Sequence, residues 1–187
     1  MSGLIEFLRC RALQGDLRKR RAGAVDELFE LLADPLYHYA LSITRQISSA
    51  EEVLQDVFMQ LVRDPDRLER VRDIKSYLFR SVRNRAYNHE RDGVREVPVE
   101  PSELFEHPDG SLDHGEAIAV QQMLAFLPDE QREVLVLKIW EGLTFREIGE
   151  ILEISANTAA SRYRYGLQHL KTLLAGEPPG VEICVTT

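Results

Sequence analysis

The stretch Leu143–Leu174, LTFREIGEILEISANTAASRYRYGLQHLKTLL, sets the architecture of the C-terminal half of the chain. It predicts two helices joined by a very short turn. Thr144 and Glu147 have the spacing of a capping box, in which each side chain satisfies one backbone N–H that the first turn leaves without a partner. The turn is expected near 153–154, and Ser155 then caps the second helix. So short a connection between helices is typical of a helix-turn-helix.

The second of these helices has two chemically different faces. Its residues from Ser155 to Ala175 include three cations and no acid. A helix that packs on one side and is cationic or hydrogen-bonding on the other suits the major groove of DNA. An ordinary amphipathic helix with a solvated polar face has the same pattern, so both interpretations stay open. The apolar face contains Ala159, Tyr163, Gly166, Leu167, Leu170 and Leu174; the polar face contains Asn157, Ser161, Arg164, Gln168 and Lys171, flanked by Thr158 and Arg162.

Composition excludes several classes of protein. The chain has 187 residues, of which 44% are hydrophobic and 29% charged, so it is able to build one domain or two small ones. Cys10 and Cys184 lie at opposite ends without a metal-like Cys/His cluster, which indicates a reducing compartment. No apolar run approaches the roughly 20 residues that span a bilayer, and the N-terminus lacks the charge order of a secretory signal. We expect a cytoplasmic protein without metal or cofactor.

The net charge of −8 argues at first against nucleic acid, but the charge is unevenly distributed. Residues 71–95 contain seven Lys/Arg and three Asp/Glu, whereas residues 96–116 contain seven Asp/Glu and no Lys/Arg. Charges are screened over about 8 Å at physiological salt, so a basic helix acts locally even within an acidic protein.

The N-terminal half predicts a series of helices. Residues 1–24 are expected to form a helix that ends in a cationic run at 18–21. A second helix, 25–33, is expected to break at Asp34-Pro35 and resume over 36–45. The strongest pattern, 49–62, begins with a capping box of Ser49 and Glu52. Its wide apolar stripe predicts burial of Val53, Leu54, Val57, Phe58, Leu61 and Val62.

A long helix is expected over Ile74–Arg91, with Asp73 as its cap. Cations alternate there with Tyr77, Phe79 and Tyr87. Cations beside exposed aromatic rings suit single-stranded nucleic acid, whose bases stack on the rings. Aromatic side chains in the core with solvated arginines would give the same pattern, and the residues alone do not separate the two.

The remaining segments predict a linker and a second helical unit. Residues 93–115 are acidic and contain three prolines, which indicates a flexible linker. Helices are expected over 116–126 and 130–141, the second with Val134, Leu135, Leu137, Ile139 and Trp140 buried. The tail 176–187 is expected to be non-helical.

Three motifs together resemble the extracytoplasmic-function (ECF) sigma factors of bacterial RNA polymerase. AEEVLQDVF at 50–58 resembles the polymerase-binding helix of the family, usually written AEDLVQEVF. Residues 77–91 resemble its WL…ARN…D..R segment. Leu127-Pro128, FREIG at 145–149 and the IS…T…SR pattern at 154–162 resemble LP…YREIA…IS..TV.SR.

The resemblance implies an all-α fold of two small helical bundles joined by a flexible acidic linker. The parts are an N-terminal extension (1–24), sigma region two (25–95), the linker (96–115), sigma region four with the helix-turn-helix (116–175) and a C-terminal tail (176–187). The implied partners are core RNA polymerase and promoter DNA, and members are commonly held by an anti-sigma protein. The linker could instead dock on the basic helices of its own chain.

The resemblance also assigns candidate binding residues and no catalytic ones. Polymerase binding falls to Glu52, Gln55, Asp56, Phe58 and Met59. Recognition of the −10 element falls to Lys75, Tyr77, Arg80, Arg83, Asn84, Asn88 and Arg91. Recognition of the −35 element falls to Asn157, Thr158, Ser161, Arg162, Arg164, Gln168 and Lys171.

Departures from the family pattern limit what carries over. Tyr77 stands where the family often has Trp, and Asn88 replaces an Asp. Ala159 and Ala160 stand where Val-Lys is common, which removes one cation that would face DNA. The base preference at −35 is therefore not transferable.

Two other classes of protein are weighed against a sigma factor. A stand-alone helix-turn-helix regulator would use the same C-terminal half but leave 50–58 without a partner. An enzyme would need a second cluster of ligands or a nucleophile beside Glu51, Glu52, Asp56 or the His89-Glu90 pair, and the sequence contains neither a phosphate-binding glycine loop nor a nucleophile elbow.

Overall fold

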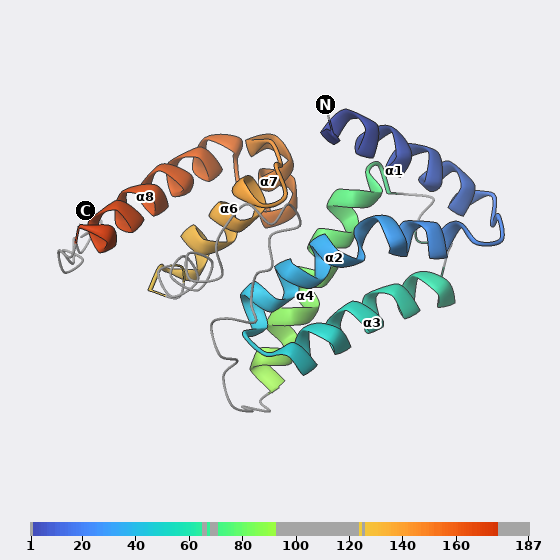
Figure 1. Ribbon diagram of the computed structural model, residues 1–187. Helices are drawn as coiled ribbons and strands as arrows, with labels where there is room; N and C mark the ends of the chain where they lie inside the picture. The colour runs from blue at the N-terminus through green and yellow to red at the C-terminus, as the bar shows by residue number, and fades with distance from the viewer. Residues whose placement is uncertain (1, 65–66, 68–70, 93–123, 125, 176–187) are drawn as a thin grey trace.

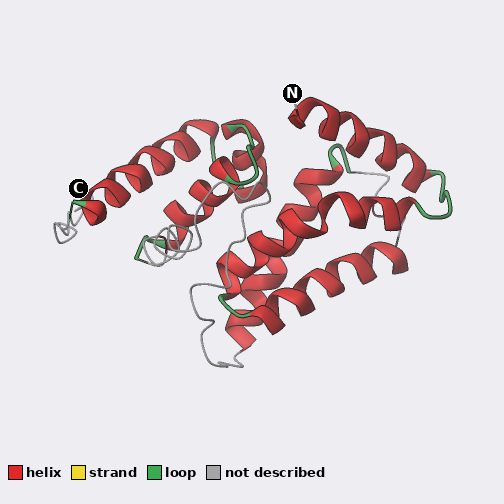
Figure 2. Ribbon diagram, viewed as in Figure 1, coloured by secondary structure: helices red, strands yellow, loops and turns green. Residues whose placement is uncertain are grey.

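The computed structural model describes residues 2–64, 67, 71–92, 124 and 126–175, and all regular structure within them is helical (Figure 2). The linker and tail predicted from the sequence, and most of the helix expected at 116–126, lie outside the described residues. The helices are α1 (Ser2–Arg18), α2 (Ala24–Thr44), α3 (Ile47–Arg63), α4 (Ile74–Asp92), α6 (Asp129–Ile139), α7 (Phe145–Leu152) and α8 (Ala156–Leu174).

The helices form two groups (Figure 1). Helices α2, α3 and α4 pack on one another, and α1 lies against α2 and α4. Their core contains the fully buried Tyr39 and Phe79, whose ring centroids are 5.5 Å apart. Helix α8 packs on both α6 and α7. The chain is therefore an all-α protein of two small helical bundles.

The predicted break at Asp34-Pro35 is wrong, because α2 runs through Pro35 without interruption. A proline inside a helix costs about 3 kcal/mol. Leu28, Leu32 and Leu36 share one face across the proline, and each is 0% exposed. Since burying one leucine side chain contributes roughly 1.5–3 kcal/mol, continuity of this buried stripe outweighs the lost backbone bond.

Helix α3 also differs from its prediction. It begins at Ile47 after Gln46, so Ser49 lies inside the helix and donates to the Gln46 side chain at 2.8 Å instead of forming a capping box with Glu52. Val62 is 56% exposed, although its burial was predicted. At about 100° per residue Val62 lies opposite Val53, and a helix that packs along one stripe leaves that side in water.

The helix-turn-helix is confirmed in detail. The Thr144 hydroxyl accepts from the Glu147 backbone N–H at 3.3 Å, and a Glu147 carboxylate oxygen accepts from the Thr144 N–H at 2.7 Å. The Ser155 hydroxyl accepts from Thr158 N–H at 3.0 Å. Gly149 is required by the tight turn, because a Cβ there would lie 2.7 Å from the Ile154 carbonyl oxygen.

Helix α6 is buried in its middle but not at its end. Arg132 to Leu137 are all buried, as expected for Val134, Leu135 and Leu137. Ile139 is 46% exposed and Trp140 is half-buried, so their predicted full burial is wrong. Ile139 is about 200° around the helix from Leu137, on the side away from the core.

The Asp73 cap of α4 is confirmed, since its carboxylate accepts from Ser76 N–H at 2.9 Å.

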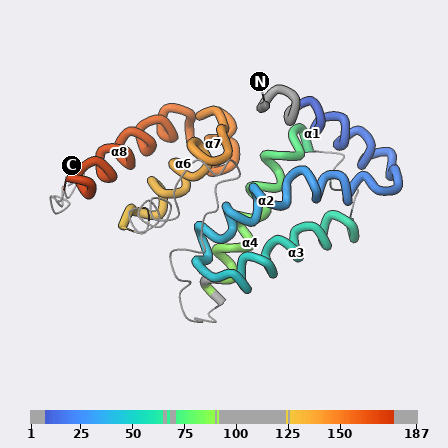
Figure 3. Tube along the Cα trace, viewed as in Figure 1, coloured from blue at the N-terminus to red at the C-terminus, as the bar shows by residue number. Residues whose placement is uncertain are grey.

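The two bundles lie against each other. Figure 3 shows α6, α7 and α8 grouped on one side of α1 to α4, and α6 packs on α2 while α7 packs on α4. The faces expected to bind polymerase and DNA therefore lie on two bundles that are in contact with each other.

Candidate nucleic-acid and polymerase interfaces

The residues expected at the −35 element lie on α8, and most of them face solvent. Asn157, Thr158, Arg164, Gln168 and Lys171 are exposed, while Ser161 and Arg162 are half-buried. On the opposite side, Ala159 and Gly166 are buried, and Gly166 packs closely on α6, because a Cβ there would lie 2.8 Å from Leu135 Cδ1. The face expected to bind DNA therefore belongs to a helix that packs closely on α6.

Two of the α8 cations already have partners within the chain. Arg162 forms an ion pair with Glu130 of α6, with Nη2 2.6 Å from the carboxylate. Arg164 Nη2 donates to the Ser161 hydroxyl at 3.2 Å. Both partners are local to this bundle, so they position the guanidinium groups without removing Arg164 from solvent.

The residues expected at the −10 element fall into two sets on α4. Asn84, Asn88 and Arg91 are exposed, whereas Lys75, Tyr77, Arg80 and Arg83 are half-buried. The structure therefore does not bring all seven to one open surface. Arg80 and Arg83 instead face the C-terminal bundle: Arg80 lies 3.9 Å from Glu153, and Arg83 contacts Glu133.

The Arg83–Glu133 pair is the centre of the contact between the bundles. Arg83 Nε and Nη2 donate to the two Glu133 carboxylate oxygens at 3.0 and 3.2 Å. Tyr39 of α2 donates its hydroxyl to the same carboxylate at 3.3 Å. The Glu133 side chain is only 3% exposed, against 28% for Arg83. We refer to Tyr39, Arg83 and Glu133 as the docking triad.

The environment of the docking triad shifts the pKa values of Tyr39 and Arg83. Burial raises the pKa of Tyr39 well above its ordinary value, and the Glu133 charge adds to this, so Tyr39 is neutral and able to donate. Burial also raises the pKa of Tyr87, whose ring lies 5.0 Å from the Arg83 guanidinium. For Arg83, burial is the largest single effect and disfavours the charge, but the hydrogen bonds to Glu133 and the attraction of its charge together raise the pKa.

Sequence reasoning did not single out Tyr39 or Glu133. Glu133 precedes the run Val134–Leu137 and is buried with it. A carboxylate at the start of a buried apolar run is a signal, because buried charges are seldom left without partners. Its partner, however, is 50 residues away in the chain.

The face expected to bind polymerase lies on α3 and is open to solvent. Glu52, Gln55, Asp56 and Met59 are exposed. Phe58 is instead buried at 6% exposure and packs edge-on against Phe29 of α2, with ring centroids 4.9 Å apart. Phe58 thus supports this face from beneath.

The acidic side chains of that face are paired with α4. Asp56 accepts from Arg85 Nε at 2.9 Å, and a Glu52 oxygen lies 2.9 Å from His89 Nε2. These exposed pairs link α3 to α4 and give Glu52 and Asp56, two of the carboxylates weighed above as metal ligands, partners within the chain. Within the described residues, no group of three or more His, Cys, Asp or Glu side chains is arranged to hold a metal ion.

A series of grooves follows α4. One groove, about 1060 Å³, lies between α4 and α7 and is lined by Arg67, Arg72, Tyr77, Arg80, Glu150 and Glu153 among others. A second, about 370 Å³, continues along α4 past Asn84 and Asn88. A third, about 440 Å³, lies among Arg83, Asn84, Tyr87 and Asn88.

Comparison with protein families accounts for both bundles. The family described as Sigma-70 region 2 matches residues 28–96, and the family described as Sigma-70, region 4 matches residues 117–170. The ECF RNA polymerase sigma factor ShbA of Streptomyces griseus is 31% identical over 134 residues, which cover 66% of this chain and 69% of ShbA. The chain belongs to the ECF sigma factors. It is a transcription-initiation factor that binds core RNA polymerase and directs it to promoters.

Other ECF sigma factors match over most of the chain. SigM of Bacillus subtilis is 27% identical over 156 residues, covering 80% of this chain and 94% of SigM. RpoE of Cereibacter sphaeroides is 29% identical over 174 residues, covering 86% of this chain and 92% of RpoE.

Two solved structures share the fold of this sigma factor. CnrH, in complex with the cytosolic domain of CnrY, is 21% identical with a TM-score of 0.69, covering 91% of this chain and 99% of CnrH. RpoE of Bartonella quintana, in complex with the anti-sigma factor NepR, is 23% identical with a TM-score of 0.68, covering 84% of this chain and 100% of RpoE. Among the described helices of this ECF sigma factor, none is both long and apolar enough to cross a membrane.

Proposed function

We propose a division of labour between the two bundles. Residues 25–95 form sigma region two, which binds core polymerase and the −10 element, and residues 116–175 form sigma region four, which binds the −35 element. Residues 96–115 connect them, and residues 1–24 and 176–187 are extensions. The observation that carries this proposal is the exposure of polar faces on α3, α4 and α8, each presented by a helix whose other side is packed.

Polymerase binding is assigned to the exposed face of α3. Gln55 and Met59 are its open centre, because Glu52 and Asp56 on either side are paired with α4. An interface usually buries such an apolar side chain among polar neighbours, so the 42% exposed Met59 fits a docking surface. Phe58 supports this face from the core.

Promoter binding requires the bundles to separate. The −10 and −35 elements are about 25 base pairs apart, or roughly 85 Å along a duplex that rises about 3.4 Å per pair. A compact chain of this length is about 40 Å across, from a radius of gyration near 16 Å. Since α4 and α6 are joined at 3.0 Å through Arg83 and Glu133, the docked arrangement does not reach both elements. Binding of polymerase and DNA must therefore replace the docking triad.

Separation would also complete the −10 surface. Arg80 and Arg83 would lose their carboxylate partners on α7 and α6 and become available to phosphates. Asn84 and Asn88 would lie beside them, where they are able to hydrogen-bond a flipped base; flipping costs a few kcal/mol of unstacking that such contacts offset. Asn157, Thr158, Ser161, Arg162, Arg164, Gln168 and Lys171 would meet the −35 element, some at base edges and others at phosphates.

The chain is proposed to supply specificity and not catalysis, and to act in the cytoplasm with the chromosome and polymerase. Its regulation is proposed to involve an anti-sigma partner, because Bartonella RpoE, which shares its fold, was solved in complex with the anti-sigma factor NepR. A protein that contacts both bundles at once would stabilise the docked arrangement and withhold Arg80 and Arg83 from DNA.

The test is transcription in vitro with core polymerase. The wild-type chain is expected to give transcripts with one defined start on its promoter. Gln55→Lys, in the open centre of the α3 face, should lower affinity for core polymerase by about tenfold or more, as expected for a central interface position. Asp26→Asn is the matched control, because it changes the charge by the same amount at an exposed position of α2. Equal core binding by the two variants would remove the α3 face from the interface.

A further inference from the structure

A cationic groove lies where α1, which precedes the matched family regions, meets the start of α4. It measures about 390 Å³ and is lined by Arg11, Gln14, Gly15, Arg18, Arg72 and Asp73. Three guanidinium groups thus face one carboxylate. That carboxylate already caps α4 by accepting from Ser76 N–H at 2.9 Å, so the groove presents mainly positive charge.

The arginines of this groove are carried on a fixed element. Gln14 Nε2 and Arg18 Nη2 both donate to the Val71 carbonyl oxygen at 2.6 Å. Leu13 and Leu17 of the same helix are buried in the N-terminal core, at 6% and 5% exposure. Helix α1 is therefore held against the segment that enters α4, and its cations have a defined place beside it.

The groove continues into the surface assigned to the −10 element. It shares Arg72 and Asp73 with the large groove between α4 and α7. That groove in turn shares Arg67, Tyr77 and Arg80 with the groove past Asn84 and Asn88. A series of grooves that share lining residues, each with arginines in its lining, thus runs from Arg11 on α1 to the middle of α4.

Opening of the bundles would make this line more positive. Glu150 and Glu153, the acids that α7 contributes to the large groove, belong to the C-terminal bundle. When that bundle moves to the −35 element, both carboxylates leave with it. Arg67, Arg72 and Arg80 then remain with Arg11 and Arg18 on one side of the N-terminal bundle.

We propose that the α1–α4 groove binds the phosphate backbone of promoter DNA next to the −10 element, so that α1 extends the DNA-binding surface beyond sigma region two. This inference rests on the proposed function, because it needs Asn84 and its neighbours to lie at the −10 element. Phosphates are the partner that matches closely spaced guanidinium groups, since each planar fork donates to two oxygens. Such contacts position DNA and carry no base preference.

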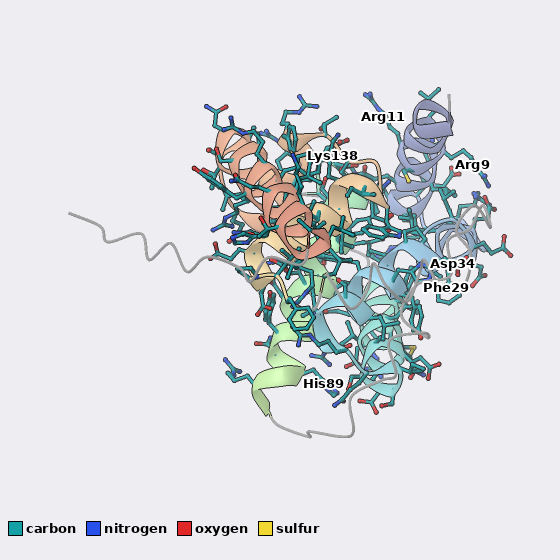
Figure 4. All side chains as sticks on the ribbon, turned by 60° about the vertical axis from the view of Figure 1, so that its left-hand side comes forward. Arg9, Arg11, Phe29, Asp34, His89 and Lys138 are labelled. Atoms are coloured by element: carbon teal, nitrogen blue, oxygen red, sulfur yellow. The ribbon has the colours of Figure 1, made fainter. Side chains whose placement is uncertain are left out.

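Two arginines of α1 provide a matched pair for the test. Arg9 and Arg11 are both exposed. In Figure 4, Arg11 extends on the side of α1 that faces the C-terminal helices, whereas Arg9 extends away from them. Only Arg11 lines the groove. Arg9→Gln and Arg11→Gln therefore remove the same charge from the same helix, but only Arg11→Gln removes it from the groove.

The experiment measures promoter binding by holoenzyme reconstituted from core polymerase and the full-length chain, across a fourfold range of salt. Each lost phosphate contact reduces the slope of log affinity against log salt by about 0.7–0.9, which makes the loss of affinity over this range about threefold smaller. We expect this change for Arg11→Gln and for Arg72→Gln, no change for Arg9→Gln, and unchanged affinity of all three for core polymerase.

A photo-crosslinking residue at position 11 identifies the partner directly. Crosslinks from position 11, and not from position 9, to promoter DNA beside the −10 element would support the inference. Crosslinks from position 11 only to a polymerase subunit, or equal salt slopes for Arg9→Gln and Arg11→Gln, would overturn it. Failure of the wild-type holoenzyme to initiate would instead overturn the proposed function, and this outcome is visible before any variant is compared.

Discussion

Replacing Glu133 with Gln should open the docked bundles. The amide has nearly the same shape as the carboxylate, so Tyr39 keeps a hydrogen-bond acceptor while Arg83 loses its counter-charge. Losing one partner of a buried ion pair costs about 3–5 kcal/mol. Arg83 is 28% exposed and water offsets part of this cost, so we expect docking to weaken by about 2 kcal/mol, or roughly 30-fold in the ratio of docked to open chains.

Small-angle scattering of the isolated chain measures this change as an increase in radius of gyration. Glu130→Gln is the matched control, because it removes a carboxylate from the same helix. Glu130 is 67% exposed and pairs with Arg162 within its own bundle. An exposed pair contributes about 0–1 kcal/mol, and its loss should leave the chain compact. If Glu133→Gln were as compact as Glu130→Gln, the docking triad would not hold the bundles together.

Three further changes probe separate parts of the chain. Arg164→Ala should weaken −35 binding and reduce its salt slope by about one unit if Arg164 meets a phosphate, or relax one base position if it meets a guanine; an unchanged promoter profile would remove it from the site. Gly149→Ala should destabilise the helix-turn-helix by more than the roughly 1 kcal/mol of a typical point mutation, because the new Cβ meets the Ile154 carbonyl at 2.7 Å; unfolding at the wild-type temperature would contradict this. Because the pKa of Tyr39 is raised by folding, its contribution to stability is fully present below the unfolded pKa of about 10 and is lost above it, at about 1.4 kcal/mol per pH unit. Denaturant titrations of the wild type and Tyr39→Phe check this last expectation, since the variant should lose stability less steeply.

Local patterns in the chain were sufficient for much of the helical structure. The Thr144–Glu147 capping box, the Ser155 cap and the Asp73 cap form between residues three apart. Such contacts depend only on neighbouring residues and on helical geometry, so spacing predicts them where the helix begins at the expected residue. It fails for Ser49 and Glu52, because α3 begins two residues before Ser49. The same holds for the exposed polar face of α8, which follows from helical periodicity.

Other features required the packed molecule. Pro35 lies inside α2 because the leucines on either side share one buried face, and Val62 is exposed because the core extends along only one side of α3. Whether these residues are buried depends on where the core lies, and the periodicity of a single helix does not predict that position.

The candidate binding residues also have some properties that the sequence predicts and others that only the packing decides. The sequence placed Arg83 and Asn84 together on one helix. It did not show that Asn84 faces solvent whereas Arg83 is paired with a buried carboxylate. Arg83 is held because Glu133, 50 residues away, is buried against it and against Tyr39. Local propensity acts over one or two helical turns, whereas burial and ion pairing act between helices that meet only after folding. The helices and their chemistry therefore follow from residues close in the chain, and the availability of each cation follows from the contact between the two bundles.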